Sequence, residues 1–505
     1  FEPLSGMAVL TVVLCLIGAV VGLYALVGFL EKRRRAQLEV TVAAKGLKLP
    51  VEIAGSIPVF GHMFYWLSKG ANQLPTHLEM AKKYGKCYSF RIFDRNIVVA
   101  VDHEIQKFVL STGFKQGLFE KGLASTERGK ELFGKGIFAV NGEEWQEQRN
   151  TASHLFHIGK MKQYIEIFHE NAFRLFDKLD SLKDNGPIDM QDMFMRYTLD
   201  SFAEIGFGVR VDSINEDVNH FARAFDYVQT WTNRRNRYGS LWKLKEALSP
   251  PSEFKAHLKY MDEFCWSIIE RRSHETEEEL TGKLDLLSIL LLTNIQHPEA
   301  KKSRDEMRDF IMNFLIAGRD TTAVMLTWCI HLLCENPDVH AKLMDEIHTV
   351  LGDKVEPTWE NTKDMRYVKQ VLQETLRLYS PVPIDGLTTT EDCVLPGNYF
   401  VKKHTPILYV NWALNRQEEY YPDAEKFLPE RWDKPTVPFS FLAFHGGPRQ
   451  CLGMEMAYLE AKIMLCNLLR RYSFKHSSDP AHKVDVKQAI ILTALNGMHM
   501  HVTRI

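Results

Sequence analysis

The chain of 505 residues lacks the features that divide long proteins into several parts. After about residue 60 it has no Gly/Ser-rich linker, no low-complexity tract and no repeating period. Hydrophobic residues make up 45% of the chain and aromatic residues 11%, which is enough to build a large core. We therefore predict one large globular domain, and the composition excludes disordered and collagen-like classes.

The sequence also lacks an excess of charge of either sign, and its cysteines are not paired. There are 62 Lys and Arg against 64 Asp and Glu, for a formal net charge of −2, so no global basic field attracts nucleic acid. The eight cysteines contain no CxxC pair and no Cys/His spacing typical of zinc. We predict no nucleic-acid partner and reduced thiols, as in a protein that faces the cytosol.

One stretch has no charge at all. Residues 7–30 form an apolar run that can span a bilayer as a helix, and "EKRRR" follows directly. A secretory signal would carry its basic residues before a shorter apolar core. We predict an uncleaved single-pass anchor, with residues 1–6 lumenal and the chain after Lys32 cytosolic; a buried core helix is the alternative. A basic, proline-containing linker over 31–57 and a globular domain over 58–505 complete the predicted organisation.

Hydrophobic periodicity predicts a mainly α protein with a minor β part. Apolar residues at spacings of three and four predict helices over 162–182, 217–231, 253–272, 305–334, 338–351, 364–378 and 453–471. Alternating apolar and polar residues predict a hairpin over 87–102 and strands within 387–410 and 486–503.

The longest helical pattern, 305–334, is apolar almost all round and should cross the centre of the domain. Its middle is "AGRDTT", residues 317–322, which places a glycine, a charged pair and two hydroxyl residues where each weakens a helix. A solvent-facing polar stripe fits less well, because Phe314, Ile316 and Met325 flank the segment. Residues that weaken a helix inside a core element point to a function.

A second unusual segment is "FHGGPRQCLG", residues 444–453, directly before the helix predicted from 453. Its glycines permit close approach of a flat partner. The positive end of the following helix is expected to lower the pKa of the Cys451 thiol. A thiolate in this setting is either a metal ligand or a nucleophile, and His445 is a candidate base for the second role.

These residues resemble the signature of the cytochrome P450 family, the haem-thiolate monooxygenases. Phe444, Gly447, Arg449, Cys451 and Gly453 match the family pattern Phe-x-x-Gly-x-Arg-x-Cys-x-Gly. Further matches are "QETLRL" to the Glu-x-x-Arg motif, "FLPERW" to the arginine motif that follows it, "AGRDTT" to the oxygen motif, and "WQEQR" to a Trp-x-x-x-Arg helix. The resemblance covers the chain from about residue 58 to its end.

The resemblance implies a role for each matched residue. Cys451 would be the axial thiolate on the iron of a non-covalently bound haem b, with Phe444 beside it and Gly453 in the same loop. Arg449, Trp145 and Arg149 would hold the haem propionates. Glu374, Arg377 and Arg431 would form a structural ion-pair group.

Asp320 and Thr321 would organise proton delivery to bound dioxygen, which is typical of true oxygenases in this family. A haem isomerase that uses a peroxide, a haem-binding sensor and a cysteine-nucleophile hydrolase remain alternatives. The chain has no G-x-G-x-x-G after a strand and no flavin domain, so an NADPH-dependent flavoprotein reductase would be a separate partner. Lys160, Lys162, Arg470 and Arg471 are candidates for docking it.

For the substrate, "AGRDTT", "TASHLF" and "VPID" resemble the long-chain fatty acid and alkane ω-hydroxylase branches. Oxidation of a sterol, another lipid or a xenobiotic is the alternative. Ala317 stands where animal fatty acid hydroxylases have a glutamate esterified to haem, so no covalent attachment is expected. A lipophilic substrate would be lined by Phe314, Ala317, Val382, Ile384, Leu492 and Leu495. The predicted location is the endoplasmic reticulum membrane, with the catalytic domain in the cytosol.

Overall fold

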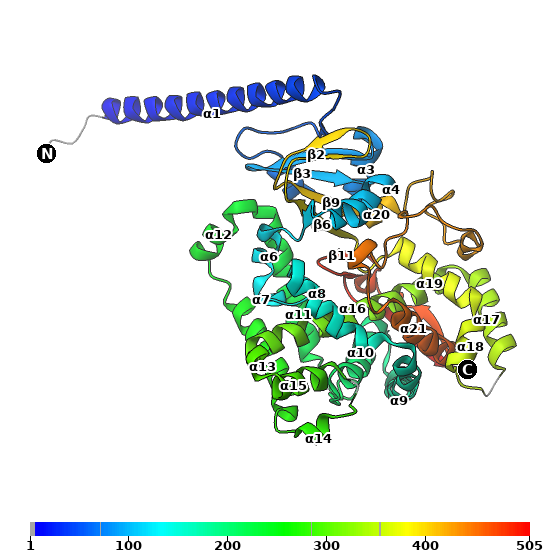
Figure 1. The fold of residues 1–505 in the computed structure, drawn as a ribbon. Helices are drawn as coiled ribbons and strands as arrows, with labels where there is room; N and C mark the ends of the chain where they lie inside the picture. Colours follow the sequence, from blue (N-terminus) through cyan, green and yellow to red (C-terminus); the bar gives the residue numbers. More distant parts are fainter. Residues whose placement is uncertain (1–5, 71, 284, 353–354) are drawn as a thin grey trace.

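The computed structural model describes residues 6–70, 72–283, 285–352 and 355–505, and it describes the side chains from residue 22 onward except at 124, 125, 237, 240 and 300. The described part of the chain folds into a helical body with a β-sheet region at one side (Figure 1). This arrangement confirms the predicted class, mainly α with a minor β part.

The α-helices, in chain order, are α1 (Gly6–Ala43), α2 (Met63–Ser68), α3 (Leu74–Tyr84), α4 (His103–Lys107), α5 (Gly113–Lys115), α6 (Leu123–Arg128), α7 (Lys130–Phe133), α8 (Gly142–Ser153), α9 (Ile158–Leu182), α10 (Met190–Phe207), α11 (His220–Arg235), α12 (Trp242–Leu248), α13 (Ser252–Arg272), α14 (Glu277–Leu280), α15 (Leu286–Gln296), α16 (Arg304–Glu335), α17 (Pro337–Leu351), α18 (Trp359–Asp364), α19 (Arg366–Leu378), α20 (Asn411–Leu414) and α21 (Met454–Leu469).

The strands form one larger sheet and three small ones. The larger sheet has the order β1-β2-β3-β9-β6-β4, and the small sheets are β10-β13-β5, β11-β12 and β7-β8. Their bounds are β1 (Val51–Glu52), β2 (Cys87–Ile92), β3 (Arg95–Ala100), β4 (Phe119–Glu120), β5 (Ile188–Asp189), β6 (Ile384–Thr389), β7 (Cys393–Leu395), β8 (Tyr399–Val401), β9 (Pro406–Val410), β10 (Tyr472–His476), β11 (Val486–Gln488), β12 (Leu492–Ala494) and β13 (His499–Arg504).

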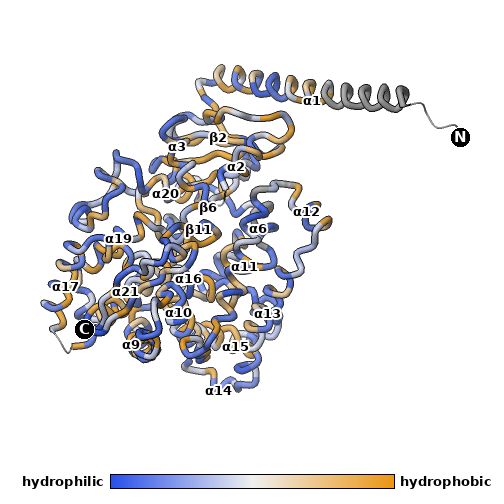
Figure 2. The backbone as a smooth tube through the Cα atoms, turned by 180° about the vertical axis from the view of Figure 1, so that it is seen from behind, coloured by the Kyte–Doolittle hydropathy of each residue, from blue (hydrophilic) through white to orange (hydrophobic). Residues whose placement is uncertain are grey.

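Every helix predicted from periodicity is present, and the predicted hairpin is the pair β2 and β3. In α17, for example, Val339, Leu343, Ile347 and Leu351 are buried at a spacing of four, and Figure 2 shows hydrophilic and hydrophobic residues mixed along this helix at the edge of the molecule. Helix α10 is absent from the prediction. Almost every one of its side chains is buried, so it has no polar face to produce a periodic pattern.

Helix α16 is the central element of the body. At about 1.5 Å per residue its 32 residues extend roughly 48 Å. Side chains from 307–316 belong to one buried apolar cluster, which also includes α11 and α13. Side chains from 323–333 belong to a second cluster with α19 and α21. The polar segment 317–322 therefore lies between the two clusters. The helix is continuous through this segment.

The N-terminal helix α1 extends away from the body (Figure 1) and continues to Ala43, through much of the predicted linker. Its C-terminal half is fixed to the larger sheet, because Arg91 on β2 binds Glu31 through two bonds of 2.6 and 2.7 Å. The predicted lumenal segment and most of the predicted anchor, up to residue 21, lie outside the residues with described side chains. Among the described residues, no helix combines the length and apolar character needed to cross a membrane.

The predicted ion-pair group lies buried where α19 meets the segment that carries Arg431. Arg377 donates to both carboxylate oxygens of Glu374 at 2.8 and 2.9 Å, and Arg431 donates to Glu374 at 2.8 Å. The side chains of Glu374 and Arg377 are 0% exposed. Arg377 also donates to the carbonyl oxygens of Asn415 and Ala424, so it holds the loop region to the helix.

We expect Arg377→Ala to lower the free energy of unfolding by about 3–5 kcal/mol, because it leaves the Glu374 carboxylate buried without its partner. Thermal denaturation of the haem-loaded protein measures the change. Lys342→Ala removes an exposed ion pair with Glu430 and should leave the denaturation midpoint nearly unchanged. If the Arg377 variant does not fold, Arg431→Ala should show a smaller loss of the same sign. Equal midpoints for all variants would contradict the structural role.

Candidate active site

A cavity of about 230 Å³ lies beside α16 and contains most of the predicted site residues. Its wall includes Phe314, Ala317, Gly318, Thr321 and Thr322 from α16, and it includes the loop before α21. Trp145, Arg149, Phe444, Arg449, Cys451 and Gly453 all line it. Tertiary folding therefore brings motifs that are separated by more than 300 positions in the sequence to one cavity.

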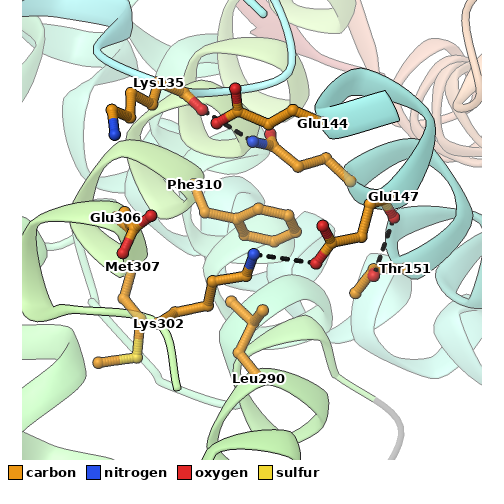
Figure 3. Close-up of a pocket in the computed structure, with 10 residues that line it drawn as sticks. Lys135, Glu144, Glu147, Thr151, Leu290, Lys302, Glu306, Met307 and Phe310 are labelled. Carbon is orange, nitrogen blue, oxygen red and sulfur yellow. Dashed lines mark hydrogen bonds and ion pairs between the residues drawn. The ribbon is translucent and has the colours of Figure 1, made fainter. Parts of the chain in front are cut away.

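A second pocket lies on the other side of α8 and is too small for a substrate. Its volume is about 30 Å³, which is room for very few water molecules. Within it, Lys302 pairs with Glu147 at 2.9 Å, and Thr151 donates to the Glu147 carbonyl oxygen (Figure 3). Helix α8 thus presents Trp145 and Arg149 to the large cavity and Glu144 and Glu147 to this small one.

The loop that carries Cys451 is held by backbone contacts. The Cys451 N–H donates to the Phe444 carbonyl oxygen at 2.9 Å, and the Gln450 N–H donates to the Gly447 carbonyl oxygen at 3.0 Å. Gly447 has a φ of +66°, and a Cβ there would lie 1.9 Å from the Leu110 carbonyl oxygen. Only glycine fits this close approach. The loop therefore has a fixed shape that presents Cys451 to the cavity.

Cys451 differs from the other described cysteines in its access. It is exposed, whereas Cys87, Cys265, Cys329, Cys393 and Cys466 are buried and Cys334 is partly buried. Although Cys451 is accessible in the cavity, the protein atoms around its thiol raise the pKa of that thiol by desolvation. The Gly453 N–H and Arg149 oppose this shift. The expected lowering of the pKa was therefore wrong, because desolvation outweighs the helix end. Coordination to a metal deprotonates a thiol outright, so this environment suits a ligand better than a free nucleophile.

Arg449, Arg149 and Trp145 form a cationic wall. The Arg449 guanidinium lies 4.7 Å from the Trp145 ring centre and donates to the Val140 carbonyl oxygen at 2.7 Å. Its Nε atom is buried and has no hydrogen-bond partner among the residues that the structure describes. Desolvation lowers the pKa of Arg449 to about 10. A half-buried guanidinium with a buried, unsatisfied N–H fits an added carboxylate. The residues present therefore fit a haem, whose propionates would meet Arg449 and Arg149.

The structure adds a polar group that sequence reasoning missed. Asp385 accepts hydrogen bonds from Lys121 at 2.8 Å, from Tyr409 at 2.8 Å and from His445 at 3.0 Å, and all four residues line the cavity. Burial opposes ionisation of Asp385, but Lys121 and His445 hold its pKa well below the usual range. His445 is thus bound to Asp385, which is a different role from a base for Cys451. The available signal was a lone carboxylate within the apolar strand pattern of "VPID".

Thr321 and Asp320 are placed differently from each other. Thr321 lines the cavity and donates to the Ala317 carbonyl oxygen at 2.9 Å. Asp320 is buried outside the cavity lining and pairs with Arg319 at 2.5 Å. Burial raises the pKa of Asp320 to about 7, although Arg319 opposes the shift. Its Oδ2 atom is buried and has no hydrogen-bond partner in the described part of the chain. Asp320 and Thr321 are thus adjacent in the sequence, but only Thr321 lines the cavity.

The predicted substrate-lining residues divide into two groups. Phe314, Ala317 and Val382 line the cavity. Ile384, Leu492 and Leu495 lie outside its lining. Ile384 packs against the core of the larger sheet, Leu492 is fully buried, and Leu495 is 49% exposed. Phe202 was missed, and it meets Gly318 so closely that a Cβ there would lie 2.1 Å from its ring. Gly318 therefore allows α10 to pack against α16.

Comparison with known proteins shows the family to which this fold and site belong. The Cytochrome P450 family model matches residues 53–500. Cytochrome P450 704C1 of Pinus taeda is 31% identical over 481 residues, covering 86% of this chain and 92% of the relative. Cytochrome P450 704B1 of Arabidopsis thaliana is 33% identical over 450 residues, covering 79% and 84%. The crystal structure of the cytochrome P450DA haem domain has a TM-score of 0.76 at 22% identity, covers 91% of this chain and 98% of that chain, and shares its fold.

The helical fold and a cavity that joins one cysteine to a cationic wall define a haem-thiolate protein. The chain belongs to the cytochrome P450 family, and it is a monooxygenase that binds haem b non-covalently through a cysteine thiolate. The roles of the individual residues remain predictions.

We expect Cys451→His to abolish the thiolate-type Soret band of the reduced carbon monoxide complex, because an imidazole cannot replace the thiolate donor. Difference spectra of the purified parent and variant measure it. Cys334→Ala, which changes a partly buried cysteine outside the cavity lining, is the control and should keep the band. A parent protein without this band would contradict the ligand role of Cys451.

Proposed function

We propose that this monooxygenase hydroxylates a lipophilic substrate, the terminal region of a long-chain fatty acid, with dioxygen and with electrons from NADPH through a partner reductase. The observation that carries the proposal is the composition of the cavity. Its lining combines Cys451, Arg149 and Arg449 with apolar side chains that include Phe138, Phe202 and Phe314. Removing apolar surface from water favours binding of a hydrocarbon chain.

The haem, when bound, supplies the iron that activates dioxygen, and the residues of the chain prepare its surroundings. Arg449 and Arg149 would neutralise the propionates, and the glycine loop fixes the position of Cys451. Apolar side chains exclude water from the region where the substrate reacts. Phe314 and Met325 on α16 and Val382 after α19 orient the hydrocarbon by shape alone.

Proton handling would fall to α16. The hydroxyl of Thr321 lies on the cavity wall, where it can hold a water or pass a proton. Asp320, whose pKa is about 7, can hold a proton at neutral pH and release it. Asp320 pairs with Arg319 and lies outside the cavity lining, so delivery to Thr321 requires a water or a rotation of the Asp320 side chain.

The reductase and the membrane belong to this proposal. An anchor over 7–30 would place the globular domain at the cytosolic face of the endoplasmic reticulum, where a lipophilic substrate partitions. Of the proposed docking residues, Lys162 pairs with Glu360 at 3.1 Å and Arg471 pairs with Glu356 at 2.9 Å. An acidic partner would therefore bind there by exchanging ion pairs, which makes salt sensitivity the expected sign of docking.

We expect the haem-loaded full chain, with a NADPH-dependent reductase in phospholipid vesicles, to add one oxygen atom to fatty acids from a pooled lipid extract. Mass spectrometry detects the gain, and omission of NADPH or dioxygen should abolish it. Oxygenated sterols in place of fatty acids would overturn the substrate class. Turnover without NADPH would favour a peroxide-using isomerase, and haem binding with no turnover would favour a sensor.

We expect Thr321→Ala to lower product formed per NADPH consumed by about 10-fold or more, because proton delivery contributes roughly 10²–10⁴ to such steps. NADPH oxidation and product are measured in the same sample. Thr327→Ala is a matched control, since Thr327 makes the same bond on α16, to the Ala323 carbonyl oxygen at 2.7 Å, outside the cavity lining. Equal coupling in both variants would contradict the role of Thr321.

A further inference from the structure

A cluster of possible metal ligands lies away from the haem cavity, at the C-terminal end of α16. His331 and Glu335 are one helical turn apart on α16, and His476 is the last residue of β10. One ligand atom from each residue lies within 4.8 Å of the other two. None of these residues lines the cavity. The two histidines are 145 positions apart in the sequence, and only the contact between α16 and β10 brings them together.

Two of the three separations between the ligand atoms fit a tetrahedral ion. Two ligand atoms at about 2.0–2.1 Å from a tetrahedral Zn²⁺ lie roughly 3.3 Å apart. His331 Nδ1 and His476 Nε2 are 3.1 Å apart, and His476 Nε2 and Glu335 Oε1 are 3.5 Å apart. Both separations are within a few tenths of an ångström of that value. Two imidazoles and one carboxylate also form a donor set that Zn²⁺ uses in proteins.

The side chains are presented by rigid elements and can be reached from solvent. The His331 ring packs edge-on against Trp328 and Tyr379, with centroid separations of 5.6 and 6.2 Å. His476 belongs to a strand that pairs with β13 over its whole length. The Glu335 side chain is 59% exposed, which provides an entry path for an ion. Ligands that are already oriented lose little entropy when an ion binds.

A hydrogen bond between the two histidines is a simpler account of their contact, but it does not satisfy all three groups. His476 Nε2 lies 3.1 Å from His331 Nδ1 and 3.5 Å from Glu335 Oε1. A ring nitrogen carries either one proton or one lone pair, so Nε2 makes one good hydrogen bond and leaves the other contact unsatisfied. A cation placed among the three atoms would interact favourably with each of them.

We propose that His331, Glu335 and His476 form a Zn²⁺ site, with water completing the coordination, and that the ion joins the C-terminal end of α16 to β10. Magnesium and calcium require six or more oxygen ligands, so the site discriminates against them. Because α16 also carries Thr321, the ion would stabilise the helix on which the proposed proton handling depends. Binding to the folded protein alone raises its stability with ion concentration.

The test uses the metal-stripped, haem-loaded full chain. Calorimetric titration with Zn²⁺ should show one site, and the visible absorption of bound Co²⁺ should be that of a tetrahedral ion. His331→Gln, His476→Gln and Glu335→Gln should each weaken Zn²⁺ binding by at least about 10-fold, because even outer partners of a metal contribute that much. Mg²⁺ should not compete.

Glu335→Gln separates ligation from a structural role, because it keeps the histidine pair and changes only an exposed side chain. Its thermal midpoint without metal should equal that of the parent, whereas the rise with Zn²⁺ should be lost. The control is His482→Gln, which alters another histidine pair, with ring centres 3.8 Å apart, whose ring nitrogens already bind Ser477 and the Asn496 carbonyl oxygen. Carbon monoxide spectra should be unchanged in every variant. A parent without Zn²⁺ binding, or binding that survives all three ligand variants, would overturn the proposal.

Discussion

The structure depends on the burial of α16, a long helix with apolar side chains on nearly all sides. Its two halves pack into different apolar clusters, and the segment between them borders the cavity. A buried helix stabilises the fold through apolar contact. The polar segment 317–322 contributes less of this stabilisation than an apolar segment would. Gly318 lets Phe202 approach, and Asp320 is buried at the expense of a raised pKa. The site therefore occupies the place where the core is interrupted.

The buried Arg377 and the half-buried Arg449 show how the same side chain serves structure or binding according to its partners. Arg377 is satisfied by Glu374 and by backbone carbonyl oxygens, so it joins α19 to the following loops and has no capacity for a ligand. Within the described part of the chain, Arg449 has no bonded carboxylate and keeps one N–H unsatisfied. Desolvation lowers its pKa, and an added anion would relieve that cost. The completeness of the hydrogen bonding, rather than the residue type, separates the two roles.

A feature could be predicted where residues nearby in the sequence determine it, and it was missed where distant residues do. The resemblance of ten adjacent residues to the family signature singled out Cys451 and Arg449, and the structure places both in the cavity lining. Helix α10 was missed because burial on all sides removes the periodic signal. Asp385 and His445 were assigned no shared role, since their bond of 3.0 Å joins positions 60 residues apart. Leu495 was placed in the pocket from the family pattern, but its strand connection leaves it half exposed.

The sequence by itself determined the helical class, the thiolate loop and the residues of α16 that interrupt its apolar surface, because these follow from periodicity and from contacts within a few residues. Only the tertiary structure decided which of those residues reach the cavity. Thr321 faces it and Asp320 does not, although they are neighbours in the chain, because successive side chains on a helix diverge by about 100°. The grouping of His331, Glu335 and His476 has the same origin: it arises where α16 meets β10, through packing between elements that no local pattern records.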